Sequence, residues 1–307
     1  MSKTAFLFPG QGAQYVEMGK DFYNAFAIAK ETFQEASDLL SRNLTDLIFK
    51  EGEALSETKN SQIAIFVVSS AILRVVRLEF PDLAAVSCAG LSLGEYTALC
   101  AAEKVAFADA VRMVSLRGQY MQEACQNARG AMRVVLGLGV EEVRAHLPAD
   151  MWIANLNCPG QVVIAGLESA MPACEEALKA QGARRILPLD VSGAFHTPLM
   201  QPAQEKLTPY LEQLKLHMGT ADIVMNVTGA VAHSEEEIRK NLIAQVVSTT
   251  EWEKGIRTIE KQKPSLYIEM GPGKTLAGMN KKIGVQAPTL SIEKVVDLEA
   301  LDGALHR

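Results

Sequence analysis

Short apolar runs alternate with longer stretches of helical periodicity along most of the chain. Residues 4–8 and 84–89 are apolar runs of strand length that end at glycine or Pro-Gly. Apolar residues recur at the spacing of amphipathic helices over about 18–40, with a break near Ala27, over 61–78, through Leu99, and over 108–125. Strands that alternate with helices at this spacing predict an α/β layer with a parallel sheet.

The pattern changes between residues 131 and 189. It predicts strands at 131–138, 151–154, 162–165 and 185–189, with helices at 140–147 and 168–181. The resulting order, β-α-β-β-α-β, is ferredoxin-like. Because the unit occurs once, we interpret it as an insertion. The predicted organisation is a large domain of residues 1–126 and 198–307 that carries a small subdomain of residues 127–197.

The alternation of helices and strands resumes after Pro198, with helices expected at 199–214, 235–247 and 251–262 and strands at 223–226 and 266–269. The longest apolar stretch, 63–73, is interrupted by two serines and falls short of the roughly 18 residues that a membrane span requires. The first apolar run is too short for the core of a signal peptide. We therefore expect a cytoplasmic protein without a membrane partner.

Composition narrows the function classes. The 307 residues carry a net charge of −6, which gives nucleic-acid binding no overall electrostatic support. Five cysteines form no C-x-x-C pair, as expected for buried thiols in a reducing compartment. The five histidines lack the spacing of metal ligands, so we expect no structural metal.

The stretch CAGLSLGEYTALC, residues 88–100, places Ser92 in a Gly-x-Ser-x-Gly motif between a strand and a helix. This is the order of a nucleophile elbow, in which a sharp turn exposes the serine hydroxyl at a helix N-terminus. The alternative is an ordinary helix N-cap, for which serine is also preferred.

A nucleophilic serine needs a base, and His196 in VSGAFHTPLM is the strongest candidate. It follows the last strand of the inserted unit, where the two domains meet. A buried loop histidine bonded to the backbone is nearly as compatible with the sequence. The other four histidines lie in polar surroundings and are expected at the surface: His146, His217, His233 and His306.

Arg117 shares one apolar helix face with Ala110, Val114 and Met121. A charge on such a face is costly unless it is paired, either with an internal carboxylate or with a ligand anion. The planar guanidinium suits a carboxylate held by two hydrogen bonds. The remaining alternative is a side chain whose stem crosses the edge of the core while its head reaches water.

Two glycine-rich stretches do not support nucleotide binding. GPGKT, residues 271–275, resembles the end of a phosphate-binding loop, but Ile268 stands where the first glycine is required. The GLG at 137–139 lacks the third glycine of a dinucleotide loop, because position 142 is Glu142.

Taken together, the chain resembles the malonyl-CoA:acyl-carrier-protein transacylases and the acyltransferase domains of polyketide synthases. The resemblance covers essentially the whole sequence and rests on seven motifs in the family's order: FPGQG (8–12), GLSLGEY (90–96), RG..M (117–121), NLNCPGQVVIAG (155–166), GAFHTPLM (193–200), Q..S (245–248) and GPGK (271–274). It implies an α/β-hydrolase-like core with a parallel sheet and an inserted ferredoxin-like subdomain.

The resemblance also implies residue roles. Ser92 would be acylated, with His196 as general base, and Arg117 would bind the free carboxylate of the malonyl group. The backbone N–H groups of Gln11 and Leu93 would form the oxyanion hole. Polar residues would support the histidine and line the pocket, namely Gln245, Gln62, Asn157 and Gln161. The implied partners are malonyl-CoA and an acyl carrier protein that brings its own phosphopantetheine, so the enzyme needs no cofactor.

The sequence departs from the family's usual pattern at two places. Leu91 replaces the histidine common before the serine, and Arg133 stands where a small apolar residue is expected. Phe195 resembles the malonyl-selecting form of the histidine loop. No triad acid is evident, although Asp190 is near enough in sequence to be one. A thioester exchange needs less help from such an acid, because a thiolate leaves more easily than an alkoxide or amine.

Two other functions share some of these features. A serine hydrolase or thioesterase would release the acyl group to water, but the charge of Arg117 disfavours a simple lipase pocket. A non-catalytic module that binds a carrier would not need both Ser92 and His196. Exposed basic residues are candidate contacts for an acidic carrier protein: Lys274, Lys281, Lys282, Arg184 and Arg185.

Overall fold

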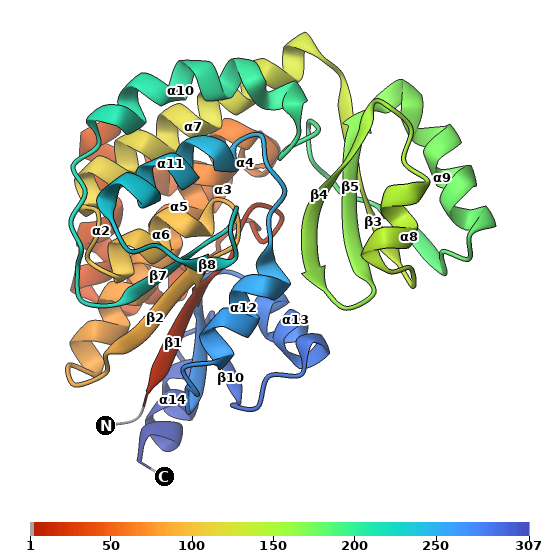
Figure 1. Ribbon diagram of the computed structural model, residues 1–307. Helices are drawn as coiled ribbons and strands as arrows, with labels where there is room; N and C mark the ends of the chain where they lie inside the picture. Colours follow the sequence, from red (N-terminus) through yellow and green to blue (C-terminus); the bar gives the residue numbers. More distant parts are fainter. Residues whose placement is uncertain (1–2, 307) are drawn as a thin grey trace.

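Two separate β-sheets organise the protein, whose structure here is a computed structural model that describes residues 3–306 (Figure 1). The larger sheet has the strand order β10-β9-β1-β2-β7-β8, parallel throughout except for the last pair, and the smaller has the order β4-β5-β3-β6. The helices and strands are, in chain order, β1 Thr4–Phe8, α1 Lys20–Ala25, α2 Ala27–Leu40, α3 Leu44–Lys50, α4 Gly52–Ser56, α5 Thr58–Glu79, β2 Ala85–Gly90, α6 Gly94–Ala101, α7 Phe107–Asn127, β3 Gly130–Leu136, α8 Val140–Ala145, β4 Met151–Cys158, β5 Gln161–Leu167, α9 Met171–Ala180, β6 Arg185–Pro188, α10 Gln201–Gln213, β7 Asp222–Met225, β8 Ala230–Val231, α11 Glu235–Gln245, α12 Trp252–Glu260, β9 Leu266–Met270, α13 Thr275–Ile283, β10 Thr289–Ile292 and α14 Asp297–Leu305.

Strand β1 is buried along its whole length because helices cover both faces of the large sheet. Phe6 and Phe8 belong to the larger apolar core, which also contains the buried faces of α2, α5 and α7. Ala5 and Leu7 alternate with them and belong to a second core with residues of α12 and α13. The predicted parallel sheet is therefore confirmed, with its carboxyl edge facing the smaller sheet (Figure 1).

Helix α5 runs through the middle of the larger core. It is long and apolar enough to cross a membrane, yet 83% of its apolar 18-residue stretch is buried inside the protein. Its Ser69 and Ser70 are buried as well. The burial on nearly all sides of this helix is the pattern of a helix inside a protein core.

The smaller sheet is antiparallel, and its elements follow in the order β3, α8, β4, β5, α9, β6. Strand β4 continues to Cys158, whereas the sequence pattern predicted its end at Ala154. The polar residues Asn155 and Asn157 looked like loop residues, but both belong to β4: Asn155 pairs with Val163 of β5, and Asn157 lies at the second of two irregularities in the register. Their side chains face a pocket between the sheets, which explains the loss of apolar character.

Several predicted boundaries differ from the structure. The helix expected at 168–181 begins with a 3-10 turn, Glu168–Ala170, before α9. The break expected near Ala27 lies at Phe26, whose extended backbone separates α1 from α2. Helices α3, α4, α13 and α14 and strands β8 and β10 were not predicted; apart from the nine-residue helices α13 and α14, they are at most seven residues long.

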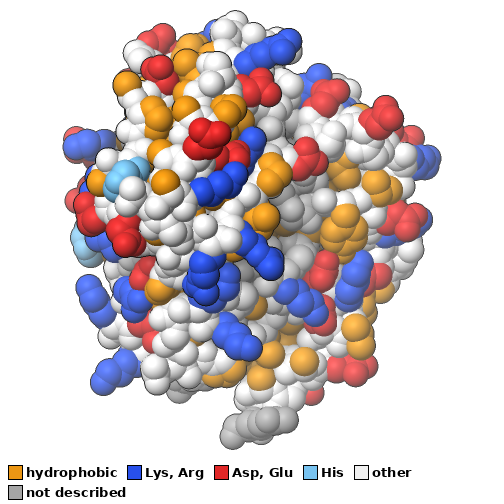
Figure 2. All heavy atoms as spheres, turned by 90° about the vertical axis from the view of Figure 1, so that its right-hand side faces the viewer, with side chains coloured by type: hydrophobic (Ala, Val, Ile, Leu, Met, Phe, Trp, Pro, Cys, Tyr) orange, Lys and Arg blue, Asp and Glu red, His pale blue; other side chains and the backbone are white. Residues whose placement is uncertain are grey.

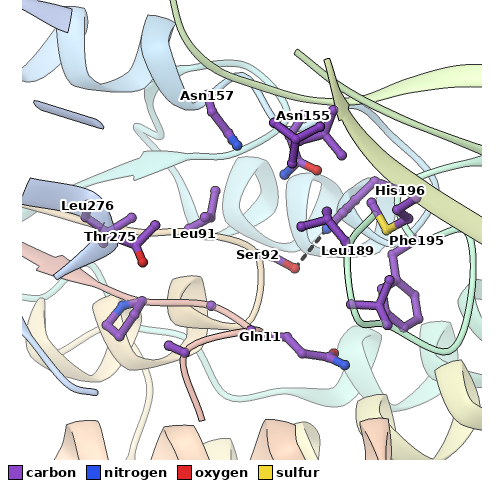
Figure 3. A pocket seen from close by; sticks show the side chains of 18 of the residues that line it. Gln11, Leu91, Ser92, Asn155, Asn157, Leu189, Phe195, His196, Thr275 and Leu276 are labelled. Carbon is purple, nitrogen blue, oxygen red and sulfur yellow. Dashed lines mark hydrogen bonds between the residues drawn. The ribbon is translucent and has the colours of Figure 1, made fainter. Parts of the chain in front are cut away.

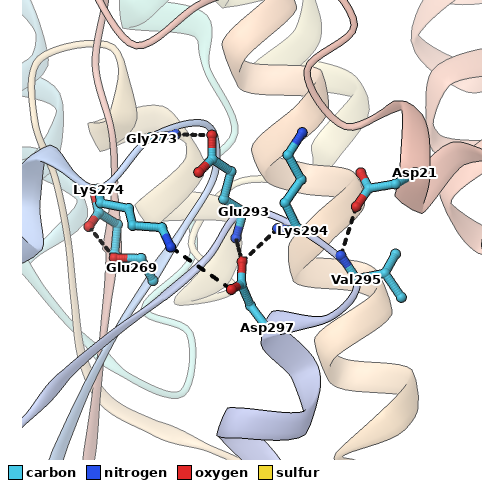
Figure 4. Close-up of polar contacts among 9 residues, drawn as sticks. Asp21, Glu269, Gly273, Lys274, Glu293, Lys294, Val295 and Asp297 are labelled. Carbon is cyan, nitrogen blue, oxygen red and sulfur yellow. Dashed lines mark hydrogen bonds and ion pairs between the residues drawn. The ribbon is translucent and has the colours of Figure 1, made fainter.

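Buried and half-buried carboxylates hold the turn between β9 and α13 (Figure 4). Glu269 is fully buried and accepts hydrogen bonds from the backbone N–H groups of Leu276 and Ala277, each at 2.9 Å. Glu293 accepts one from the N–H of Gly273 at 3.0 Å. Carboxylates at a helix N-terminus satisfy its free donors, so these contacts fix the position of α13 against the pocket.

Candidate active site

Ser92 lies in the turn between β2 and α6, at the carboxyl edge of the large sheet. Its φ of 52° is in the left-handed region, which is strained for a non-glycine residue. A side chain at Gly90 would overlap the backbone of Gly94, and one at Gly94 would overlap the carbonyl of Phe8. The two glycines of the motif are thus required by close backbone packing, and the turn has the geometry of an elbow that presents the serine hydroxyl.

His196 lies directly against this hydroxyl (Figure 3). The structure places His196 Nε2 2.8 Å from Ser92 Oγ, and His196 Nδ1 2.8 Å from the backbone carbonyl oxygen of Gln245. The imidazole is held in place by a neutral acceptor, and Asp190 is exposed on the loop that precedes it. The carbonyl requires a proton on Nδ1, which leaves Nε2 unprotonated and able to accept the serine proton.

Burial keeps this imidazole neutral. His196 is 4% exposed, and burial together with the nearby positive charge of Arg117 lowers its pKa to about 4, although its hydrogen bonds to backbone groups of Gln245 and Ser248 oppose the shift. A neutral imidazole is the form that can accept a proton near neutral pH.

Arg117 is buried beside both residues, with an exposed fraction of 1%. Its Nη2 donates hydrogen bonds to Ser92 Oγ at 3.1 Å and to Gln245 Oε1 at 2.9 Å, and its Nη1 donates to Gln62 Oε1 at 2.6 Å. Its Nε has no acceptor within residues 3–306. The alternative in which the guanidinium reaches water is therefore wrong, and two of its five N–H donors, that of Nε and one of Nη1, make no hydrogen bond within residues 3–306.

The sequence analysis missed Glu95 and Asn226, which hold the elbow from below. Glu95 is fully buried and accepts hydrogen bonds from the backbone N–H of Asn226 and from Gln245 Nε2, each at 2.6 Å. Asn226 Oδ1 accepts from the N–H of Ser92 at 2.7 Å. Burial raises the pKa of Glu95 to about 7, opposed by these hydrogen bonds and by Arg117. Only the glutamate's place directly after a motif glycine could have signalled this role.

A cavity of about 290 Å³ opens in front of Ser92, between the two sheets (Figure 3). Its wall includes four of the residues singled out from the sequence as polar or oxyanion-hole positions: Gln11, Gln62, Asn157 and Gln161. The backbone N–H groups of Gln11 and Leu93 find no acceptor within residues 3–306. The Gln11 side chain donates to Thr58 Oγ1 at 3.2 Å, which fixes the loop after β1 at the N-terminus of α5.

The two residues that departed from the family's pattern, and Phe195 beside the histidine, have distinct places. Leu91 and Phe195 line the cavity. Arg133 points away from it and pairs with Glu175 of α9, with Nε 2.6 Å from Oε1, so the unexpected charge on β3 is neutralised between sheet and helix. Outside the site, three histidines are exposed as predicted (His217, His233 and His306), and His146 is half-buried.

The five candidate basic contacts are all exposed. Lys282 Nζ donates to Gln161 Oε1 at 2.9 Å, bridging the end of α13 and the cavity wall. Lys274 Nζ lies 4.0 Å from Asp297 Oδ1 (Figure 4). Figure 2 shows Lys and Arg side chains gathered near the middle of the face that includes the small sheet, among scattered Asp and Glu.

Comparison with known proteins identifies the family. The family sequence model of the acyl transferase domain matches residues 5–297. The chain is 38% identical to the malonyl CoA-acyl carrier protein transacylase of Bacillus subtilis strain 168, over 97% of this chain and 96% of that protein.

Solved structures agree with this assignment. A protein named MCAT from Streptococcus pneumoniae is 41% identical, with a TM-score of 0.92 over 97% of this chain and 99% of that one. A malonyl-transacylase in complex with a type II polyketide synthase acyl-carrier protein is 36% identical, with a TM-score of 0.93 over 98% of this chain and 100% of that one. The protein therefore belongs to the acyl transferase family.

Proposed function

We propose that the protein transfers the malonyl group from malonyl-CoA to the phosphopantetheine thiol of an acyl carrier protein, in fatty acid biosynthesis. The observation that carries the proposal is the contact of Ser92 with both a neutral, buried imidazole and a buried guanidinium. The first supplies acyl-transfer chemistry, and the second selects an acyl group with its own negative charge. Two of the relatives named above have this activity in their names.

In the first half-reaction, Ser92 Oγ attacks the thioester carbonyl carbon while His196 Nε2 takes the hydroxyl proton. The carbonyl oxygen becomes an oxyanion, and we assign its stabilisation to the N–H groups of Gln11, which lines the cavity, and of Leu93, which follows Ser92, because neither has an acceptor within residues 3–306. The tetrahedral intermediate then collapses. The C–S bond breaks, His196 returns the proton to the sulfur, and malonyl-serine remains.

In the second half-reaction, the carrier's thiol takes the place of CoA. His196 accepts the thiol proton, the sulfur attacks the malonyl-serine ester, and Ser92 recovers its proton as the C–O bond breaks. The phosphopantetheine arrives on the carrier, so the enzyme itself requires no cofactor. Lys274, Lys281 and Lys282 lie at or next to helix α13, whose Thr275, Leu276 and Met279 line the cavity, and this supports an approach of the acidic carrier over that helix.

Arg117 binds the malonyl carboxylate in this proposal. Its contact with Ser92 Oγ places the guanidinium where a three-carbon acyl group on that oxygen can fold back to reach it. Gln62 and Gln245 hold the guanidinium by their amide oxygens, and Asn157 and Gln161 provide polar wall positions for the rest of the substrate. A hydrolase for uncharged acyl groups would gain nothing from a buried cation here.

The same proposal includes the finer description of the fold. We assign residues 1–126 and 198–307 to an α/β-hydrolase-like domain, since the serine elbow follows a central parallel strand. We assign residues 127–197 to a ferredoxin-like subdomain, supported by the strand order β4-β5-β3-β6. Five free cysteines are consistent with the reducing cytoplasm.

Intact-protein mass spectrometry after incubation with malonyl-CoA tests the function directly. The wild-type protein should gain the mass of one malonyl group, and the adduct should disappear when a carrier thiol is added. Ser92→Ala should keep the fold and lose the adduct, because a methyl group occupies the same turn. An adduct that persists on another residue of Ser92→Ala would overturn the assignment of the nucleophile, and release of free malonate in place of transfer would indicate a hydrolase.

A further inference from the structure

Glu95 touches neither the cavity nor the serine side chain, yet it lies at the centre of the contacts beneath them. It is the second residue of α6 and is fully buried. Both carboxylate oxygens are engaged: Oε1 by the backbone N–H of Asn226, and Oε2 by the side-chain amide of Gln245. Burying a carboxylate costs free energy unless its partners stabilise the charge. Here neither partner is a cation.

These two partners hold the backbone of Ser92 from both sides. Asn226 Oδ1 accepts the serine N–H at 2.7 Å, and Asn226 Nδ2 donates to the carbonyl of Gly90 at 2.7 Å. Gln245 Nε2 donates to the carbonyl of Ser92 at 2.9 Å. Because Ser92 has a strained φ of 52°, its conformation persists only while the surrounding contacts fix it.

Gln245 connects Glu95 to the rest of the site. Its Nε2 faces two acceptors, Glu95 and the Ser92 carbonyl, so its Oε1 must face the Arg117 guanidinium, which can only donate. Its backbone carbonyl accepts the Nδ1 proton of His196. The carboxylate therefore selects the one orientation of this amide that suits the arginine.

We propose that Glu95 is a positioning residue of the acyl-transfer site, which fixes Asn226 and Gln245 and through them Ser92, Arg117 and His196. This rests on the proposed function. In Glu95→Gln, one carboxylate oxygen is replaced by an NH₂ group. This NH₂ group would face another hydrogen-bond donor, either the Asn226 N–H or the Gln245 NH₂. One of the two supports of the elbow would then be lost while the size of the side chain stayed the same.

A double-mutant cycle tests whether Glu95 acts through Gln245. The variants are Glu95→Gln, Gln245→Ala and their combination. The measurement is the single-turnover rate of malonyl-serine formation, normalised to the fraction of protein that can be acylated. We expect Glu95→Gln to slow acylation roughly 10- to 100-fold, as misplacement of reacting groups does. The double variant should be little slower than Gln245→Ala alone, since the second change removes a contact that is already absent.

The matched control is Glu260→Gln, a half-buried carboxylate that accepts hydrogen bonds from the backbone N–H of Gln286 at 3.1 Å and from the Tyr267 hydroxyl at 2.5 Å, and that does not line the cavity. It should lower the melting temperature without changing the ratio of malonyl to acetyl acylation, whereas Glu95→Gln should lower that ratio because Arg117 is displaced. If Glu95→Gln does not fold, Glu95→Asp replaces it in the double-mutant cycle. This variant keeps the charge, but its side chain is one methylene shorter.

Wild-type acylation rates in Glu95→Gln, or a double variant slowed by the product of the two single effects, would overturn the proposal. These outcomes are distinct from a failure of the proposed function, in which the wild-type protein itself would form no malonyl adduct.

Discussion

Replacing Arg117 with alanine separates binding of a substrate carboxylate from a structural role of the arginine. In the structure the guanidinium makes three hydrogen bonds, to Gln62 and Ser92 of the cavity wall and to Gln245, and its Nε has no acceptor within residues 3–306. In Arg117→Ala a malonyl carboxylate would lie in a partly dry pocket without a cation. Removing one partner of such a charge pair costs about 2–5 kcal/mol.

That free energy corresponds to a decrease in kcat/KM for malonyl-CoA of about 30- to 4,000-fold, since 1.4 kcal/mol is a factor of ten. Acetyl-CoA has no second carboxylate, so its kcat/KM should hold or rise. Two buried acceptors, Gln62 Oε1 and Gln245 Oε1, lose a donor in the variant, at a cost of about 1–3 kcal/mol each. Relief from burying the charge of Arg117 opposes this loss of stability.

The assay compares kcat/KM for malonyl-CoA and acetyl-CoA in the wild-type protein and in Arg117→Ala, with thermal unfolding of both. Arg112→Ala is the matched control, because Arg112 lies on the same helix, is exposed and, among residues 3–306, forms an ion pair with Asp109 alone, at 3.6 Å. An inverted acyl preference would support carboxylate binding. A parallel decrease for both substrates, accompanied by a lower melting temperature, would refute it and leave Arg117 with a structural role.

The remaining predictions concern His196 and Glu95. His196→Ala should slow both acylation and transfer by roughly 10²- to 10⁴-fold in a folded protein, and near-normal transfer across pH would show that another group carries the proton. Because burial lowers the pKa of His196 to about 4, kcat/KM should stay level well below pH 6.5 and fall only near pH 4; an acid limb at pH 6.5 would contradict the buried geometry. The same group binds a proton more readily when the chain is unfolded, so its contribution to the free energy of unfolding is present above pH 6.5 and is lost as the pH falls toward 4. Glu95 acts in the opposite sense, because its pKa is raised to about 7: its contribution is present below pH 4.5 and is lost as the pH rises through 7. Equilibrium unfolding of the wild type and Glu95→Gln over this range separates the two groups.

The features that could be predicted from the sequence are those set by local spacing. Apolar runs of strand length located β1, β2 and β9, and the two glycines around Ser92 located the elbow, because the close packing that they permit is a property of the turn itself. The contact of His196 with Ser92 was harder to infer, since 104 residues separate the two. The local sequence fits equally well a buried loop histidine that is hydrogen-bonded to the backbone.

Contacts between distant segments explain what was missed. Glu95 and Asn226 meet across 131 residues, and neither side chain stands out in its own stretch. Arg133 looked misplaced on a strand until Glu175, 42 residues later, proved to neutralise it. Helix α13 was hidden by the Pro-Gly sequence before it, and its position depends on Glu269, whose burial no local pattern indicates.

The absence of a triad carboxylate follows from what surrounds His196. A carboxylate on Nδ1 would stabilise the imidazolium, and in this pocket it would also compete with the substrate's carboxylate for the charge of Arg117. The Gln245 carbonyl fixes the tautomer without adding a negative charge, and the buried carboxylate of Glu95 is separated from the guanidinium by the Gln245 amide. The imidazolium that forms during transfer is consequently poorly stabilised, since both burial and Arg117 disfavour it. The imidazolium therefore gives up its proton readily. A short-lived imidazolium is enough for this reaction, because the leaving group is a thiolate.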